Sequence, residues 1–347
     1  MEKAKQVVWR LLAASVCVMA VSQAVHADSL DEQRNRYAQI KQAWDNKQMD
    51  TVQALMPTLK DYPLYPYLEY RQITDDLMNQ PTVTVNNFIQ ANPTLPPARN
   101  LQSRFVNELA RREDWRGLLA FSPEKPGTTE AQCNYYYAKW ATGQQEEAWV
   151  GAKDLWLTGK SQPNACDSLF GAWRASGKQD PLAYLERIRL AMKAGNTRLV
   201  TALAGQMPSD YQTISSAVIG LANDPNSVLT FARSTGATDF TRQMAAVAFT
   251  SVARDDVENA RLMIPQLVQA QQLNEEQTQE LRDTVAWRLM GTDVTDEQAR
   301  WRDDAIMRSN STSIVERRVR MALGTGDRRG LNTWLSRLPM EAKEKDE

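Results

Sequence analysis

One pattern recurs along almost the whole chain of 347 residues. An amphipathic helical segment is followed by a short polar or glycine-containing break and then by a second helical segment that closes on leucine or methionine. Such a hairpin cannot bury its apolar face alone, so it must stack on neighbours. Neighbouring breaks are often roughly 30 residues apart, close to the period of about 34 in tetratricopeptide repeats. The breaks lie around Asn46, Asp114, Gly143, Gly195, Asn223, Asp255 and Gly326.

These repeats predict an all-α fold, an irregular α-solenoid of helical hairpins that is tetratricopeptide-like in shape but not in strict consensus. The full Trp, Leu-Gly and Tyr consensus is never met, and the units drift in length. Thr82–Val85 is the best candidate for a strand, although Pro81 can equally start a helix there. A solenoid buries its apolar faces locally, so one superhelical domain over residues 28–347 is expected despite its length.

The stretch from Cys133 to Cys166 is the clearest of these hairpins. Apolar residues recur at helical spacing on both sides of Gly143, which supplies the left-handed geometry that ends a helix. The recurring residues are Tyr136 and Trp140 before the break, and Ala148, Ala152, Leu155 and Trp156 after it.

Residues 1–27 have the character of a secretory signal peptide. Lys3, Lys5 and Arg10 precede an apolar run at 11–21, and Val25–Ala27 forms a small-residue cleavage site. The run is short for a membrane span, and no other segment approaches 18 uninterrupted apolar residues. A protein secreted to the periplasm and lacking a membrane anchor is expected.

Cleavage at this site removes Cys17 and the only histidine, His26, and leaves Cys133 and Cys166 as the remaining thiols. In an oxidising compartment these two are expected to form a disulfide, the alternative being two separate buried thiols. Cys17 is a poor lipid-attachment site because Val16 stands where a small residue is needed. No zinc site can be completed from two cysteines without a histidine. We expect no metal and no cofactor.

The charge balance excludes some partners. The chain has 41 basic and 42 acidic residues, which favours neither nucleic acid nor an anionic membrane. The hydrophobic fraction of 42%, with ten tryptophans, is typical of a folded protein.

A tyrosine-rich stretch at Asp61–Tyr70 interrupts the repeats. Its prolines stop one helix and start the next. Tyrosine can stack on a sugar ring while its hydroxyl forms a hydrogen bond, so these side chains are candidate glycan contacts. The alternative is a corner between helices that the tyrosines pin in place. The four residues are Tyr62, Tyr65, Tyr67 and Tyr70.

Catalytic constellations are few. Without histidine, neither a Ser-His-Asp nor a Cys-His arrangement can be assembled. Acid/base catalysis by carboxylates needs two acids in unlike environments. Most adjacent acids are better explained as helix N-terminal or exposed charges. The pairs are Glu146 with Glu147, Asp255 with Asp256, Glu275 with Glu276, and Asp303 with Asp304.

Two further motifs have structural explanations. The glycines of Gly324–Gly330 have the wrong spacing for a phosphate loop and follow a predicted helix at 315–323, so a hairpin turn is expected. The arginines of Glu316–Arg320 and Arg111–Asp114 are expected on solvated helix faces. Binding of a carboxylated polymer by these arginines is the alternative.

Four features together resemble the N-terminal part of the soluble lytic murein transglycosylases of Gram-negative bacteria. They are the signal segment followed by DSLDEQR at 28–34, the DYPLYPYLEYRQI corner at 61–73, the NPTLPPARNLQSRF connection at 92–105, and the hairpin between Cys133 and Cys166. The resemblance covers essentially the whole chain. It implies a periplasmic protein whose N-terminal helices form a horseshoe-like superhelix, with a cysteine pair matching Cys133 and Cys166.

The family cleaves peptidoglycan between N-acetylmuramic acid and N-acetylglucosamine without hydrolysis and leaves 1,6-anhydro ends. One glutamate acts as acid and then base in a lysozyme-like domain that follows the superhelix. The Glu-Ser pair and the Gly-Leu-Met-Gln signature of that domain do not occur in this chain. No catalytic residue is carried over, and the chain is expected to be inactive alone.

The sequence is therefore interpreted as the non-catalytic superhelical domain of such an enzyme. Its expected partners are peptidoglycan glycan strands and the catalytic domain. The run Met340–Glu347 begins a helix without a polar cap, which favours truncation at the C-terminal end. The rival hypothesis is a stand-alone periplasmic α-solenoid scaffold that binds protein partners.

Overall fold

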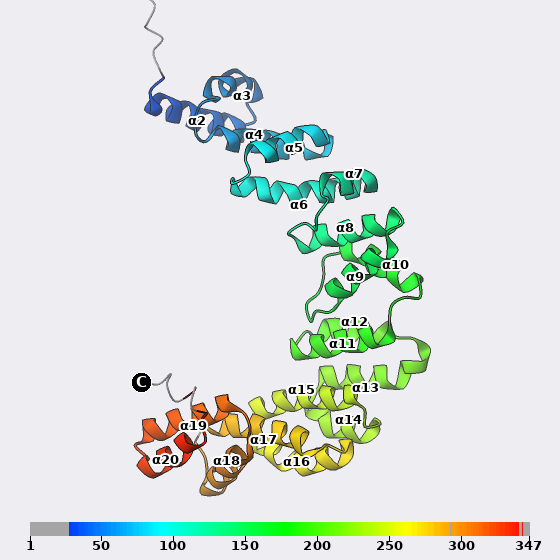
Figure 1. The fold of residues 1–347 in the computed structure, drawn as a ribbon, viewed down its shortest axis with the longest axis vertical. Coiled ribbons are helices and arrows are strands. Elements are labelled where there is room, and N and C mark those ends of the chain that lie inside the picture. Colours follow the sequence, from blue (N-terminus) through cyan, green and yellow to red (C-terminus); the bar gives the residue numbers. More distant parts are fainter. Residues whose placement is uncertain (1–27, 292, 340–341, 343–347) are drawn as a thin grey trace, which may run out of the picture. The chain divides into compact units, whose positions relative to one another are not determined.

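The computed structural model describes residues 28–291, 293–339 and 342 (Figure 1). The predicted signal peptide, residues 1–27, lies outside the described residues, and so does the predicted helix start at 340–347 apart from Ala342. Every regular element in the described part is an α-helix or a short 3₁₀ helix. The all-α prediction is confirmed.

The first compact unit contains the described residues up to Pro126. Its helices pack mainly on their chain neighbours, α2 on α3, α5 on α6 and α6 on α7. Their bounds are α2 Leu30–Asp45, α3 Met49–Leu55, η1 Met56–Leu59, α4 Tyr65–Asp75, η2 Leu77–Asn79, α5 Thr82–Ala91, α6 Pro96–Arg111 and α7 Trp115–Phe121.

The second compact unit begins at Gly127. Successive helices again pack on each other, and α11 and α17 also contact α15, the longest helix of this unit. The first bounds are α8 Thr129–Ala141, α9 Gln145–Trp156, α10 Ala165–Ala175, α11 Pro181–Lys193, α12 Thr197–Gly205, η3 Ser209–Tyr211, α13 Gln212–Asn223, η4 Pro225–Ser227 and α14 Val228–Ser234. The remaining bounds are α15 Asp239–Asp255, α16 Val257–Gln271, α17 Glu275–Leu289, α18 Asp296–Arg308, α19 Thr312–Thr325 and α20 Arg328–Ser336.

The predicted breaks coincide with the turns between helices. Gly143, Gly195 and Gly326 have φ values of 92°, 70° and 69°, the left-handed region that glycine enters without steric cost. The side chains of Asn196 and Asp327 then accept hydrogen bonds from the amides of Leu199 and Gly330 and start the next helix. The glycine run at 324–330 is therefore a hairpin turn, as predicted.

The candidate strand at Thr82–Val85 is the first turn of α5. Pro81 precedes it as the N-cap residue, with an extended backbone that leads into the helix. Val85 and Phe88 are buried one turn apart on the same helix face, and this helical spacing overrides the short alternation of Thr and Val.

The core of the second unit runs without interruption from α8 to α17. Near its start, the Trp156 ring meets Phe170, Trp173 and Tyr184 edge-on, with ring centroids 4.9 to 6.3 Å apart. Its indole N–H donates to the backbone oxygen of Ala183 at 2.9 Å. A disulfide beside this cluster joins Cys133 on α8 to Cys166 on α10, which confirms the predicted pair.

The hairpin of α8 and α9 is held unusually close at Gly151. A Cβ atom at this position would lie 2.3 Å from the ring of Tyr136 on α8. Only glycine therefore lets the tyrosine ring lie directly on the α9 backbone. The face predicted for α8 from Tyr136 and Trp140 is only half-buried, and the buried face of this helix carries Tyr135 instead.

Candidate functional site

The four carboxylate pairs do not form an acid/base centre. Glu146 and Glu147 occupy the first turn of α9, and Glu275 and Glu276 that of α17, as expected for helix N-termini. Asp255 ends α15, and Asp256 caps α16 through the amide of Asn259. These six carboxylates lie at helix ends, as expected for charges with a structural role.

Asp303 is different, because it lies between two buried arginines. Its carboxylate accepts hydrogen bonds from Arg302 at 2.9 Å and from Arg318 at 2.9 and 3.1 Å. Burial raises the pKa of Asp303, but the hydrogen bonds from the two arginines outweigh burial and hold the pKa below its ordinary value. The prediction of a solvated face was wrong for Arg318. Its side chain is 93% buried and bridges α19 to α18.

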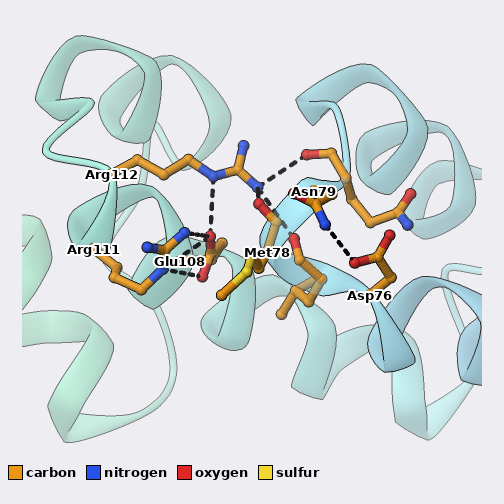
Figure 2. Close-up of polar contacts among 8 residues, drawn as sticks. Asp76, Met78, Asn79, Glu108, Arg111 and Arg112 are labelled. Atoms are coloured by element: carbon orange, nitrogen blue, oxygen red, sulfur yellow. Dashed lines mark hydrogen bonds and ion pairs between the residues drawn. The ribbon is translucent and has the colours of Figure 1, made fainter.

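Arg112 also departs from the prediction of a solvated face, whereas Arg111 is exposed as predicted. Figure 2 shows the Arg112 guanidinium between Glu108 and the backbone around Met78. It donates to the backbone oxygens of Leu77, Met78 and Gln80 at 3.0 to 3.1 Å, and to the Glu108 carboxylate at 3.0 Å. Arg112 thus satisfies the carbonyls at the end of η2 and ties that segment to α6.

Glu108 also has a second partner. Arg111 donates to both of its carboxylate oxygens at 2.6 to 3.1 Å (Figure 2). This hydrogen bonding is the main reason why the pKa of Glu108 lies below its ordinary value, and Arg112 adds to the effect. With both guanidinium groups engaged, this cluster is a clamp within the first unit rather than a free anion site.

The four tyrosines of the 61–70 stretch do not share one surface. Tyr62 is buried against Tyr37 of α2, with ring centroids 5.5 Å apart, and Tyr65 is half-buried beside the same core. Tyr70 points toward α6, where its hydroxyl accepts a hydrogen bond from Arg104 at 3.0 Å. Only Tyr67 is exposed, at 37%. The stretch is a tyrosine-pinned corner, and a glycan contact there stays a prediction.

The first unit also holds one carboxyl in a cavity. Glu69 lines a cavity of about 390 Å³ between α4 and α5, and burial raises its pKa. Among the residues that the structure describes, the remaining lining includes Gln72, Asn87 and Asn92 but no second acid. The pair of carboxylates that glycosidic-bond chemistry normally uses is therefore not assembled at this cavity.

The second unit carries a basic groove that the sequence did not reveal. A cavity of about 660 Å³ is lined by residues of α11, α15 and α17, and it shares Arg254 and Arg288 with an adjoining cavity of about 490 Å³. Five basic and two acidic side chains line the two cavities. They are Arg189, Lys193, Arg254, Arg288 and Arg317, with Glu280 and Asp255. We call this lined surface the basic groove.

Some of the groove's positive charge is already neutralised. Arg254 donates to Asp255 at 2.9 Å, which holds the pKa of Asp255 below its ordinary value, and nearby Arg288 lowers it further. Arg189 pairs with Glu186. Lys193 and Arg288 form no ion pair within the part of the chain that the structure describes, although Asp255 and Glu280 lie in the same groove.

An aromatic platform lies at one end of the groove. The Arg317 guanidinium stacks on Trp287 at 4.3 Å from the ring centroid, and Trp287 is 37% exposed. Because Arg317 covers one face of the ring, only the other face can stack on a sugar, while the neighbouring cations bind carboxylates. The arrangement therefore suits a carboxylated, sugar-containing ligand.

The groove was missed because its residues come from separate helices. Arg254 and Arg288 each read as a single basic residue near a helix end, which is ordinary. Their proximity depends on the packing of α15 on α17, which sequence spacing does not reveal. The pairing of α11 with α15 brings Arg189 and Lys193 to the same surface.

Two negative findings apply to the described residues. No helix among them combines the length and apolar character needed to cross a bilayer. No group of three or more His, Cys, Asp or Glu side chains among them is arranged to hold a metal ion.

Comparisons with known proteins support the resemblance seen in the sequence. The chain matches no family model. It is 85% identical over all 347 residues to the soluble lytic murein transglycosylase of Escherichia coli K12, of which it covers 54%. The match to the corresponding Salmonella typhimurium protein is 82% over the same share. The chain thus spans about half the length of the curated relatives it matches.

Comparison with solved structures leads to the same conclusion. The 70 kDa soluble lytic transglycosylase SLT70 of Escherichia coli superposes with a TM-score of 0.88 at 87% identity, over 92% of this chain and 52% of that one. The lytic transglycosylase Slt of Pseudomonas aeruginosa gives 0.74 at 25% identity, over 88% of this chain and 50% of that one. These matches confirm the predicted superhelical fold class. Over its whole length, the chain therefore corresponds to the N-terminal half of the soluble lytic murein transglycosylases.

Proposed function

We propose that this chain is the superhelical, non-catalytic part of a periplasmic soluble lytic transglycosylase and that it holds peptidoglycan glycan strands for cleavage. The bond between N-acetylmuramic acid and N-acetylglucosamine is then broken by a catalytic domain, with a 1,6-anhydro end as the product. The basic groove is the observation that carries this proposal.

The chemistry of the groove fits that substrate. N-acetylmuramic acid carries a carboxylate on its lactyl group, and the attached peptides carry more. Lys193 and Arg288, which form no ion pair among the described residues, offer charges to such groups, and the face of Trp287 that Arg317 leaves uncovered offers a surface for a sugar. A neutral oligosaccharide gains only the stacking contribution.

The test compares two ligands on the purified chain. Soluble murein glycan fragments should bind, and oligomers of N-acetylglucosamine, which lack the carboxylate, should bind much more weakly. The double variant K193Q/R288Q, which removes the two cations without an ion pair among the described residues, should weaken the binding of murein fragments about tenfold, as expected for losing charge-assisted contacts. R198Q removes an exposed arginine outside the groove and serves as the matched control.

Added salt should weaken the binding of murein fragments by the wild-type chain, because exposed charges are screened. Equal retention of both ligands, or of fragments by wild type and double variant, would refute the role of the groove. If a periplasmic extract yields protein partners while murein is not retained, the scaffold hypothesis replaces this one.

A second assay addresses catalysis. The chain is incubated with intact murein sacculi, and the products are examined by mass spectrometry beside the full-length enzyme. We expect 1,6-anhydro muropeptides only from the full-length enzyme. Anhydro products from the chain alone, after contamination is excluded, would show that a carboxylate in it is catalytic.

A further inference from the structure

A buried arginine with no ion-pair partner among the described residues marks a second site in the second unit. Arg187 on α11 is only 4% exposed. Its guanidinium lies over Trp156 at 4.4 Å and over Phe170 at 5.5 Å from the ring centroids. Its Nε atom is buried and has no hydrogen-bond partner among the described residues, and the group forms no ion pair there. A buried cation normally has such a partner.

Arg187 lines a cavity of about 370 Å³ between α9, α10, α11 and α12. The walls are apolar on several sides, formed by Trp156, Phe170, Leu199 and Leu203. Burial lowers the pKa of Arg187 to about 10, which leaves the guanidinium charged at neutral pH. The cavity thus offers one buried positive charge within an apolar wall.

The other charges of the lining indicate what kind of anion fits. Asp167 and Arg174 line the same cavity and are exposed, and Arg174 is engaged with Gln206 at 3.2 Å. Asp167 is near enough to raise the pKa of Arg187 but forms no ion pair with it. The lining has one net positive charge, and a dianion costs much more to remove from water than a monoanion does, so a single carboxylate suits this apolar cavity better.

The polar groups at the mouth add a further preference. The carboxylate of Asp167 can accept a hydrogen bond from a ligand amide, and Ser161 can donate or accept one. We propose that this cavity binds a monocarboxylate that carries an apolar side chain and an amide, as the C-terminus of a short peptide does, with Arg187 binding the carboxylate. This proposal goes beyond the glycan groove and does not depend on it.

The probe is N-acetyl-L-leucine, and its neutral counterpart is N-acetyl-L-leucinamide. Isothermal titration of the purified chain should show saturable binding of the acid. The amide and inorganic phosphate should each bind at least about tenfold more weakly, because the first lacks the charge and the second lacks an apolar group and costs more to remove from water. Equal binding of acid and amide, no binding of the acid, or preference for phosphate would overturn the proposal.

Variants of Arg187 give a second readout. R187M keeps a long side chain that can contact the aromatic rings, and it should abolish binding of the acid while the helical circular dichroism is retained. R187K keeps the charge without the planar fork and should bind about tenfold more weakly. R198Q, which removes an exposed arginine outside the cavity, should bind as wild type does.

Each of these results either supports or overturns the binding of the carboxylate by Arg187. Unchanged binding in R187M or R187K would overturn it. If R187M fails to fold, R187K decides, since weaker binding by a folded R187K supports the proposal and equal binding contradicts it. K193Q/R288Q should leave binding of N-acetyl-L-leucine unchanged, so a failure of the glycan groove and a failure of this cavity are told apart.

Discussion

Arg318 and Arg187 occupy the same kind of position in two regions of the second unit. Each lies in the apolar stripe of its helix, with Val315, Val319 and Ala322 around the first, and Tyr184, Ile188 and Ala191 around the second. Each guanidinium stacks on a tryptophan, Trp334 at 5.0 Å and Trp156 at 4.4 Å.

The two arginines differ in their counter-ion. Arg318 has the carboxylate of Asp303 at 2.9 Å, whereas Arg187 has none within the described residues. A buried charge with an internal partner joins two helices and has little left to offer a ligand. A buried charge without one keeps its binding capacity and lowers the stability of its surroundings. The contrast separates a structural arginine from one suited to binding.

The largest effect is expected when Asp303 is removed. D303A leaves Arg302 and Arg318 buried without a counter-ion and should destabilise the packing of α18 on α19 by about 3 to 5 kcal/mol. Hydrogen exchange of amides in α18 to α20 measures this loss locally. D303A/R318M, which also removes one orphaned charge, should recover part of it. A loss of less than about 1 kcal/mol would mean that the pair is no better than an exposed one.

Removal of the disulfide should act on the Arg187 region alone. The Cys133–Cys166 bridge closes a separation of 33 residues, for which the chain-entropy model gives about 3 to 4 kcal/mol. C133A/C166A should therefore loosen α8 to α10 and weaken binding of N-acetyl-L-leucine, because α10 carries Asp167 and Phe170. Hydrogen exchange in α18 to α20 should stay unchanged, and a change there would show that the two regions are coupled.

Lowering the pH should destabilise the Arg318 region less than D303A does, because a protonated Asp303 still accepts hydrogen bonds. The pKa of Asp303 is lower in the folded protein than in the unfolded chain. Its contribution to stability is therefore complete above about pH 4, the ordinary value, and is lost as the pH falls through the lowered folded value. Hydrogen exchange of α18 and α19 across this range checks it. D303A should lack this pH dependence.

The smallest loss of stability is expected when an exposed cation–π contact is removed. Arg317 lies over Trp287 at 4.3 Å, but both side chains reach solvent. R317Q should cost about 0.5 to 1 kcal/mol, the usual value for an exposed cation–π contact. Thermal denaturation beside R320Q, a change at the neighbouring exposed arginine, measures it. A loss comparable to that of D303A would show that stacking, rather than the carboxylate, holds such arginines.

Local features of the fold were predictable from the sequence. The breaks at Gly143, Gly195 and Gly326 depend on a backbone conformation that glycine favours, and they are visible without knowledge of the packing. The disulfide was also predictable, because only Cys133 and Cys166 remain after the expected cleavage.

The partners of the arginines were harder to predict from the sequence. Arg187 and Arg318 fall at the buried phase of their helices, and that phase was a usable signal of burial. Whether a counter-ion lies opposite depends on which residues of the next helix face the arginine. Asp303 is 15 residues from Arg318 and reaches it only through the packing of α18 and α19. The basic groove depends on interhelical packing in the same way.

The disulfide also has a mechanical consequence. In a stack of helices pulled from its two ends, each hairpin that opens lengthens the chain. The covalent link between Cys133 and Cys166 lets tension bypass the intervening segment, so the residues from 134 to 165 cannot extend while the link is intact. At about 3.5 Å per residue this withholds on the order of 110 Å of contour length. The segment that contains Trp156 would therefore not lengthen under a force that extends the neighbouring helices.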